Sequence, residues 1–554
     1  MKPKKMPKGK LTHSYNIPSI LILVLTIGLV IGYIAGPSLY AIHSDCTDSL
    51  LWSQITLETG NVLDENFRYA AILPFGASLW MVPILGIFGY TVTAHIVSMS
   101  VFAILFVLAV YFLFRGAKWN QTGSALAAMV ITLLLSTTAK LREIMWEHTI
   151  YYSLSILFVV VLLNLTLRLL DIMEESKDKL PTKFWVLMGL LFLIAIGCGT
   201  DGFQVVAISV LPVAAALVAH RFFHKDPLSS NETRKSAALI GIMAAGTVVG
   251  VLMLRAWTGG GEISAGYAEA YTVWTDVSSW MDNLQKLVPD YIQLFTTAVP
   301  AKKSMISAQS AAALIMLLGL AVITAGHIFL ICRYRKLEKA AQLMLWVHLV
   351  VSAVVLFGWI CGKLSVANWR LIPMLGTSLL SAMFAIRDLW ENKGLLRRIG
   401  VLMLCVVLLA STIAPVTIMK KYESQRTTIR AEKEVATLLQ EQAPSLGYAT
   451  FWNCNIITLL SDGQVDMLNT IIQNGEVCPR LYQTRTDQFD RRKQANESCF
   501  LLLTSSEYNT LKQNGYLSDL NQENTILKEI NCRGYYILIL EKDLFYNYSG
   551  SIYA

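Results

Sequence analysis

Residues 17–41, IPSILILVLTIGLVIGYIAGPSLYA, are followed at once by a polar segment, His43-Ser-Asp45-Cys-Thr-Asp48-Ser-Leu-Leu-Trp52. The apolar run is long enough to cross the hydrocarbon core of a bilayer, which needs about 20 residues. Asp45 and Asp48 are therefore expected at the membrane edge, where a carboxylate is costly unless it has a partner or a task. This position makes the two aspartates candidate functional residues.

The composition of the whole chain predicts a membrane protein. Of its 554 residues, 54% are hydrophobic and 15% are charged, whereas soluble proteins have about 25% charged residues. About eleven apolar runs have the length of a span, and they predict helices at 18–41, 92–114, 122–139, 150–169, 184–199, 203–220, 237–254, 308–332, 341–361, 370–386 and 397–415. A further stretch, 70–89, is interrupted by prolines and glycines and predicts a broken or re-entrant element.

Lysine and arginine concentrate in alternate connections, beginning with the segment Lys2–Lys10. This positive-inside pattern predicts a cytoplasmic N-terminus. The first apolar stretch exceeds the 7–15 residues of a signal-peptide core, so an uncleaved helix is favoured over a secretory signal. The cytoplasmic loops account for the net charge of +8, and no nucleic-acid partner is predicted.

Two long outer loops, 42–91 and 255–306, are expected to carry juxtamembrane helices. In the second loop, apolar side chains recur at helical spacing on Trp280, Leu284, Leu287 and Tyr291. A helix with such a face lies along the membrane or packs onto the C-terminal tail domain.

The composition becomes polar after Pro415, which predicts a transmembrane domain over 1–419 and a soluble extracytoplasmic α+β domain over 420–554. A helix at 421–442 and strands at 500–504 and 535–540 are expected there. Four cysteines of this tail either form disulfides, as an oxidising compartment permits, or remain buried thiols. They are Cys454, Cys478, Cys499 and Cys532.

The connection between the third and fourth predicted helices contains Glu147 and His148. This pair would contact a substrate or bind a metal, or Glu147 would form a structural ion pair with Arg142. A divalent ion held by Asp45, Glu147 and His148 has acceptable ligand chemistry. No compact ligand motif supports it, so no metal site is predicted.

Basic side chains at the outer helix ends are candidates for binding an anionic group, in the order Arg370, Lys363 and Arg142. Arginine can form two parallel hydrogen bonds with a phosphate, whereas lysine acts as a point charge. The alternative is that these side chains reach to lipid head groups. Asp201, which follows two glycines, is expected to cap the next helix, with substrate binding as the alternative.

Four segments of the first loop together resemble a known pattern. They are Asp45 to Trp52, Gly60, Tyr69-Ala-Ala-Ile-Leu-Pro74-Phe-Gly76 and Pro83-Ile-Leu-Gly-Ile-Phe-Gly89. This region resembles the start of bacterial C-type (GT-C) glycosyltransferases, in the branch of the protein O-mannosyltransferases and aminoarabinose transferases. The resemblance implies a cell-membrane enzyme that transfers a sugar from a polyprenyl-phosphate donor to a glycan, lipid or protein acceptor on the outer face.

Such a reaction needs a general base for the acceptor and positive charge for the leaving lipid phosphate. Asp45 and Asp48 are the candidate bases, and the resemblance favours Asp45 because it is the first acid after the helix. Either aspartate could instead cap the juxtamembrane helix. The competing hypotheses are a transporter or flippase of lipid-linked or small solutes, which would carry its charges at the membrane midplane, and a non-catalytic membrane assembly factor.

Overall fold

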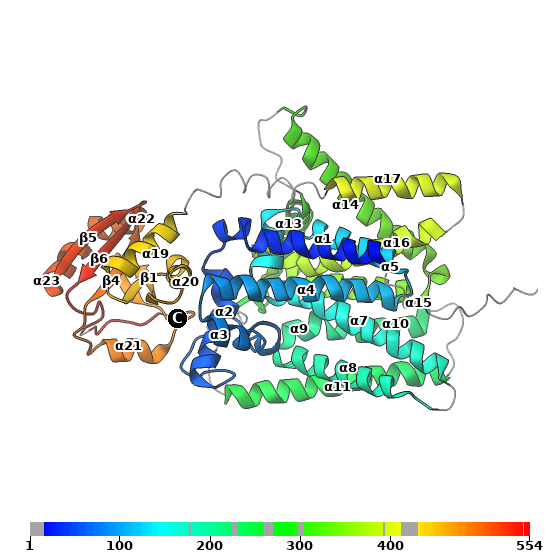
Figure 1. Cartoon of the computed structure of the whole chain (residues 1–554), viewed down its shortest axis with the longest axis horizontal. Helices are drawn as coiled ribbons and strands as arrows, with labels where there is room; N and C mark the ends of the chain where they lie inside the picture. The colour runs from blue at the N-terminus through cyan, green and yellow to red at the C-terminus, as the bar shows by residue number, and fades with distance from the viewer. Residues whose placement is uncertain are drawn as a thin grey trace, which may run out of the picture.

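The computed structural model describes residues 16–176, 179–223, 230–259, 263, 270–296, 304–391, 394–411, 430–546 and 548–553. Long helices run side by side in a bundle, and a mixed sheet domain formed by the tail lies at one end of it (Figure 1). The bundle helices are α1 (Ile17–Ile34), α4 (Val92–Gly116), α5 (Gln121–Leu134), α7 (Tyr151–Glu175), α8 (Thr182–Thr200), α9 (Phe203–Ile208), α10 (Val210–Phe223), α11 (Ser230–Thr258), α14 (Ala308–Arg333), α15 (Lys339–Ile360), α16 (Ile372–Glu391) and α17 (Leu395–Ser411).

Shorter elements gather where the bundle meets the tail. They are η1 (Pro37–Tyr40), α2 (Ser44–Thr59), η2 (Pro74–Ser78), α3 (Val82–Phe88), α6 (Ala139–Arg142), η3 (Glu143–Glu147), α13 (Val277–Phe295), η5 (Leu364–Val366) and η6 (Asn368–Leu371). The turn η4 (Tyr334–Lys336) links α14 to α15.

Nine helices in the described part of the chain are long and apolar enough to cross a membrane, or ten if one bent pair counts as a span. Ten of the eleven predicted helices correspond to these segments. The eleventh, 397–415, corresponds to α17, which is shorter than a span where it is described. Residues 412–415 of that prediction lie outside the described residues.

The bent pair corrects the prediction of a straight helix at 122–139. Here α5 ends at Leu134, and the chain turns by 118° into the segment Ala139–Glu147. The hydroxyls of Thr137 and Thr138 donate to the carbonyls of Phe295 and Leu294, at 3.1 and 2.8 Å. These bonds to α13 stabilise the bend, because hydroxyl groups that bond to another helix compete with a continuous helix at this point.

The ambiguous stretch 70–89 contains only η2 and α3, as expected for a segment interrupted by proline. Pro74 begins η2, and α3 ends at Gly89, whose φ of +67° suits a residue without a side chain.

The tail forms a six-stranded sheet with the strand order β3-β2-β1-β4-β6-β5. Parallel pairing joins β1 to β2 and to β4, and the other neighbours are antiparallel. The strands are β1 (Leu446–Thr450), β2 (Asp466–Gln473), β3 (Glu476–Pro479), β4 (Cys499–Thr504), β5 (Ile526–Cys532) and β6 (Tyr535–Leu540). The helices are α19 (Ala431–Gln442), α20 (Phe451–Leu460), α21 (Thr486–Arg492), α22 (Ser505–Gln513) and α23 (Tyr516–Glu523).

The strands expected at 500–504 and 535–540 are β4 and β6. The helix expected at 421–442 is described only as α19, since residues 412–429 lie outside the described residues. That gap also contains the predicted domain boundary at 419. All four tail cysteines are free thiols, and three of them are buried.

The tail is joined to the first loop by hydrogen bonds that span most of the chain. Trp52 on α2 donates its indole N–H to Gln483 at 2.8 Å, and the backbone N–H of Arg68 donates to Thr484 at 3.0 Å. Arg430 donates to the carbonyls of Leu39 and Ile42. The tail therefore covers the end of the bundle that carries α2 and α3 (Figure 1).

The helix α13 lies in the loop predicted at 255–306 and packs on α15. The indole of Trp359 donates to the carbonyl of Asn283 at 2.8 Å, and the Asn283 amide donates to Ile360 at 3.0 Å. Leu287 and Tyr291 of the predicted face pack against the core, whereas Leu284 is exposed.

Glycines allow α8 and α11 to approach closely. A Cβ added to Gly250 would lie 2.1 Å from the Ile196 carbonyl oxygen, and one on Gly199 would lie 2.4 Å from the carbonyl of Thr247. Gly246 and Gly250 form the small-xxx-small spacing that is common where membrane helices pack.

We expect Gly250→Ala to lower the free energy of unfolding by about 1–3 kcal/mol, since the added methyl group would overlap a backbone oxygen. Thermal unfolding of the purified protein in detergent measures this loss. Gly241 on the same helix has open space around it, so Gly241→Ala is the matched control and should melt at or slightly above the wild-type temperature. Equal melting of Gly250→Ala and wild type would contradict the close contact.

Candidate functional site

The chain turns after α1 and leads directly into α2, which carries Asp45 and Asp48. Gly36 and Pro37 begin the turn η1, and α2 begins at Ser44 with Asp45 in its first turn. The side chain of Asp45 is 36% exposed. The carboxylate therefore lies at the end of the first span and is partly exposed.

Asp45 belongs to a group of ionisable side chains that come from two loops. The imidazole of His43 lies 4.0 Å from the Asp45 carboxylate and 3.4 Å from the carboxylate of Glu143. Glu143 also forms an ion pair with Lys140 at 2.6 Å. We call Lys140, Glu143, His43 and Asp45 the loop cluster.

The environment of the loop cluster shifts the pKa values of Asp45 and His43. Burial raises the pKa of Asp45 above its usual range and the charge of Glu143 adds to the rise, while His43 opposes it. Burial lowers the pKa of His43, but the carboxylates of Glu143 and Asp45 outweigh that effect and raise it above its ordinary value. The imidazole and the two carboxylates therefore favour each other's charged forms.

Asp48 lies one turn further along α2 and is 9% exposed. Burial raises its pKa well above the usual range, Asp45 raises it further, and the Gln483 amide of the tail lowers it only in part. The two aspartates, which the sequence alone did not distinguish, thus have different surroundings.

Glu147 and His148 are brought close to the loop cluster, but both are buried. Glu147 accepts a hydrogen bond from Tyr33 and lies 4.0 Å from the thiol of Cys46. Burial lowers the pKa of His148 to about 3, so its ring is neutral. Among the described residues, no three metal-ligating side chains gather into a group.

Arg142 does not form the alternative ion pair with Glu147, and Tyr33 contacts both side chains. Its guanidinium is 5.7 Å from the centre of the Tyr33 ring and donates to the carbonyls of Ser136 and Thr137. Arg142 and Tyr33 both line a hollow of about 20 Å³ between α1 and α5.

The other basic candidates come from the loop between α15 and α16. Arg370 is 2% exposed, stacks 3.7 Å above the ring of Tyr271, and donates to the backbone carbonyl of Lys363 at 2.8 Å. The side chain of Lys363 is exposed. The ammonium of Lys140 lies 4.6 Å from the ring centre of Trp369, so this loop adjoins the loop cluster.

Asp201 performs a task that the sequence did not indicate. Its two carboxylate oxygens accept the backbone N–H groups of Phe75 and Gly76, each at 2.8 Å. The side chain does not cap α9, which begins after Gly202 without a side-chain cap. The capping prediction is therefore wrong, because the carboxylate is engaged by two backbone N–H groups at the start of the π-helical turn η2.

Sequence analysis also missed Glu143 and Tyr33 as partners in this region. The spacing of Lys140 and Glu143, three residues apart on a helical turn, is a signal for an ion pair that could have identified Glu143. No local signal points to Tyr33, which is 114 residues from Glu147.

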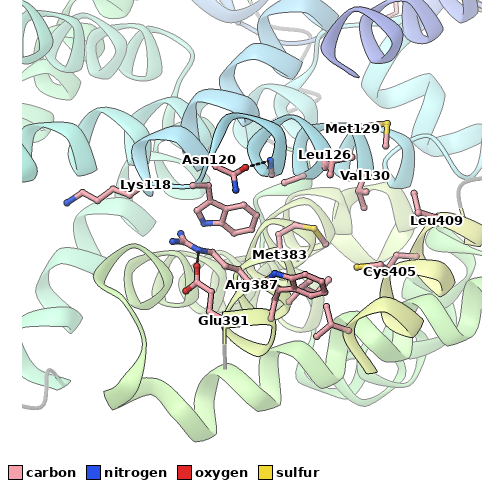
Figure 2. Close-up of a pocket in the computed structure, with 17 residues that line it drawn as sticks. Lys118, Asn120, Leu126, Met129, Val130, Met383, Arg387, Glu391, Cys405 and Leu409 are labelled. Carbon is pink, nitrogen blue, oxygen red and sulfur yellow. Dashed lines mark hydrogen bonds and ion pairs between the residues drawn. The ribbon is translucent and has the colours of Figure 1, made fainter. Parts of the chain in front are cut away.

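A cavity of about 550 Å³, lined by Lys118, Arg387 and Cys405 among others (Figure 2), includes none of these residues. It is formed by α5, α16 and α17 near Lys118, where Arg387 and Glu391 form an ion pair at 2.7 Å. The helix α4 begins beside the tail and ends next to Lys118, and its 25 residues rise about 37 Å. This cavity is therefore at the opposite end of the bundle from Asp45.

No family model and no curated protein matches this chain. Its structure is similar to that of ArnT from Cupriavidus metallidurans bound to undecaprenyl phosphate, at 12% identity and a TM-score of 0.54, covering 95% of this chain and 98% of that one. The apo form of the same ArnT matches over the same shares at 12% identity and a TM-score of 0.53. The archaeal oligosaccharyltransferase AglB from Archaeoglobus fulgidus is also similar, with a TM-score of 0.48, 10% identity, and coverage of 89% of this chain and 70% of that one. The chain therefore has the fold of ArnT, with a polytopic helical bundle and a C-terminal α+β domain.

Proposed function

We propose that this chain transfers a sugar from a polyprenyl-phosphate-linked donor to an acceptor, with Asp45 as the general base. The observation that carries the proposal is the partly exposed carboxylate of Asp45 at the membrane edge, beside His43 and Glu143. The undecaprenyl phosphate bound to ArnT, which has the same fold, supports the donor class.

Asp45 is favoured over Asp48 because a base must reach the acceptor hydroxyl or amine. Asp45 is partly exposed, whereas Asp48 is buried and faces Gln483 of the tail. We assign Asp48 to the contact between α2 and the tail.

The leaving lipid phosphate would be stabilised by the basic groups at the same end of the bundle. Lys363 is exposed and offers a mobile charge, and Arg370 holds the backbone that carries it. Arg142 faces the hollow beside α1, and its Nε is buried without a partner among the described residues. Arg142 is therefore the candidate for contact with a phosphate at the membrane edge.

Glu147 and His148 are proposed to stabilise the connection between α5 and α7 rather than to bind the acceptor. Both are buried, and Glu147 is engaged by Tyr33. In this proposal Glu143, from the same loop, is the acid that lies beside the catalytic group and keeps His43 oriented toward Asp45.

The proposal requires the loop cluster and the tail to lie outside the cytoplasm, as the distribution of lysine and arginine predicts. We also propose that the transmembrane and tail domains, 1–419 and 420–554, divide the work into catalysis and acceptor handling. A reporter enzyme that is active only outside the cytoplasm, fused after the C-terminus, tests this orientation.

The direct experiment supplies the purified protein with a panel of undecaprenyl-phosphate-linked sugars and a membrane extract as the acceptor source. We expect free undecaprenyl phosphate to appear in step with labelled acceptor, as measured by mass spectrometry. Movement of the intact lipid-linked sugar across a vesicle, without cleavage, would instead support a transporter.

The rate of transfer should fall as the pH is lowered, since a general base acts only when deprotonated. Because burial and Glu143 raise the pKa of Asp45, the acid limb of kcat/KM should lie above the usual range of an aspartate. His43→Asn removes a positive charge that lowers this pKa, so the limb should move to higher pH. A shift to lower pH in the variant would contradict the role of His43.

A further inference from the structure

A second pocket, of about 290 Å³, lies between α2 and the tail. Gln54 and Glu58 line it from α2, Tyr90 from the end of the first loop, and Asn455, Asp466 and Arg485 from the tail. None of the residues assigned above to base or phosphate chemistry lines this pocket.

The walls of the pocket are held by backbone hydrogen bonds between the first loop and the tail. The backbone N–H of Arg68 donates to the carbonyl of Thr484 at 3.0 Å. The backbone N–H of Gln483 donates to the carbonyl of Arg68 at 2.9 Å. The N–H of Thr486 donates to Asn66 at 2.7 Å. The pocket is therefore part of a fixed junction and not a gap between loosely placed domains.

The charges on these walls exclude an anionic ligand. Glu58, Asp466 and Arg485 are the charged side chains that line the pocket in the described part of the chain. Arg485 already forms an ion pair with Asp487 at 3.2 Å, which leaves the two carboxylates unbalanced.

Amide groups complete the lining and suit a ligand rich in hydroxyl groups. Asn455 is 5% exposed, and its Nδ2 has no hydrogen-bond partner among the described residues. A buried donor of this kind costs about 1–3 kcal/mol unless it finds an acceptor. The amide of Gln54 donates to Glu58 at 2.7 Å and orients that carboxylate.

We propose that this pocket binds a saccharide unit of the acceptor, one that is neutral or carries an amine. The carboxylates would accept hydrogen bonds from hydroxyl or ammonium groups, and Asn455 would donate to a ring or hydroxyl oxygen. This inference rests on the proposed sugar transfer in one respect, which is that the bound saccharide is identified as part of the acceptor. Binding itself does not depend on Asp45.

The geometry also implies that the acceptor is extended. Asp45 and Gln54 are nine positions apart on α2, which corresponds to about 14 Å along the helix. One sugar cannot occupy the pocket and present its reacting group to Asp45 at the same time. The acceptor would therefore be an oligosaccharide, or a saccharide attached to a larger molecule.

The test measures binding of four probes to the purified full-length protein by ligand-observed NMR. The probes are glucosamine, N-acetylglucosamine, glucose 6-phosphate and ethanolamine. We expect glucosamine to bind most tightly, N-acetylglucosamine less tightly, and glucose 6-phosphate weakest of the three sugars. Tightest binding of glucose 6-phosphate, or equal binding of ethanolamine and glucosamine, would overturn the proposal.

The double variant Glu58→Gln/Asp466→Asn keeps the shape of the lining and removes both charges. It should lose about tenfold or more of the affinity for glucosamine, since hydrogen bonds to charged groups are the stronger ones, and melt like the wild type. Unchanged binding in a folded double variant would place the saccharide elsewhere and overturn the assignment.

Asp45→Asn separates this inference from the proposed function. The variant should bind glucosamine as the wild type does, because the pocket does not include Asp45. Saccharide binding by the wild type without any sugar transfer would refute the enzyme while leaving the pocket in place. Transfer that proceeds without saccharide binding at the pocket would refute only the pocket.

Discussion

Replacing Asp45 with asparagine should reduce kcat for sugar transfer by about 10³-fold, within the range of 10² to 10⁴ that general bases contribute. Asparagine has the same shape as aspartate but cannot accept the proton of the attacking group. His43 and Glu143 keep their 3.4 Å contact in this variant, so the fold around the site should remain. The measurement is the initial rate of transfer from an undecaprenyl-phosphate-linked sugar, with KM determined separately.

Asp48→Asn is the matched control, because it makes the same change one turn further along α2. Asp48 is buried against Gln483, and we expect kcat to stay within about tenfold of the wild type, below the loss that a general base would cause. Loss of transfer in Asp48→Asn, together with a normal rate in Asp45→Asn, would reverse the assignment. Loss in Glu143→Gln alone would move the role of base to Glu143.

Replacing Asp201 with alanine should lower the free energy of unfolding by about 2–6 kcal/mol. The change leaves the N–H groups of Phe75 and Gly76 without their acceptor, and each buried donor without a partner costs about 1–3 kcal/mol. The turn η2 also holds α2, since the Ser53 hydroxyl donates to the carbonyl of Ser78 at 3.0 Å. Thermal unfolding in detergent measures the loss, and the rate of transfer should fall with it.

Asp462→Ala provides the comparison for this loss. Asp462 is exposed and accepts a single backbone N–H, that of Val92, at 3.2 Å. Removing an exposed hydrogen bond of this kind should cost about 1 kcal/mol or less. If Asp201→Ala melts like Asp462→Ala, the carboxylate does not hold η2.

The spans were predictable because apolar length is a local property of the chain. The runs at 92–114 and 150–169 correspond to α4 and α7, and proline and glycine marked the broken segment 70–89. The run at 122–139 is also apolar, yet it bends at Ser136 to Thr138. The hydroxyls that stabilise the bend bond to α13, more than 150 residues away, and no local pattern encodes that partner.

The candidate site was predictable only as a set of residue types at helix ends. The sequence placed Asp45, Asp48, Glu147 and Arg370 there, and the first-loop motifs indicated the fold that the comparison with ArnT confirmed. The sequence did not reveal that Tyr33 donates a hydrogen bond to Glu147 or that Glu143 lies beside His43. Those contacts depend on how the ends of α1, α2 and η3 pack together.

By itself, then, the sequence determined the class of the protein, most of its spans and the position of two aspartates at a membrane edge, because hydropathy and charge act over a few neighbouring residues. Only the tertiary structure distinguished those aspartates. The tail folds back onto α2 through Trp52 and Gln483, buries Asp48 and leaves Asp45 partly exposed beside His43. The physical reason is that desolvation of a carboxylate depends on everything packed around it, and here the covering residues come from the far end of the chain.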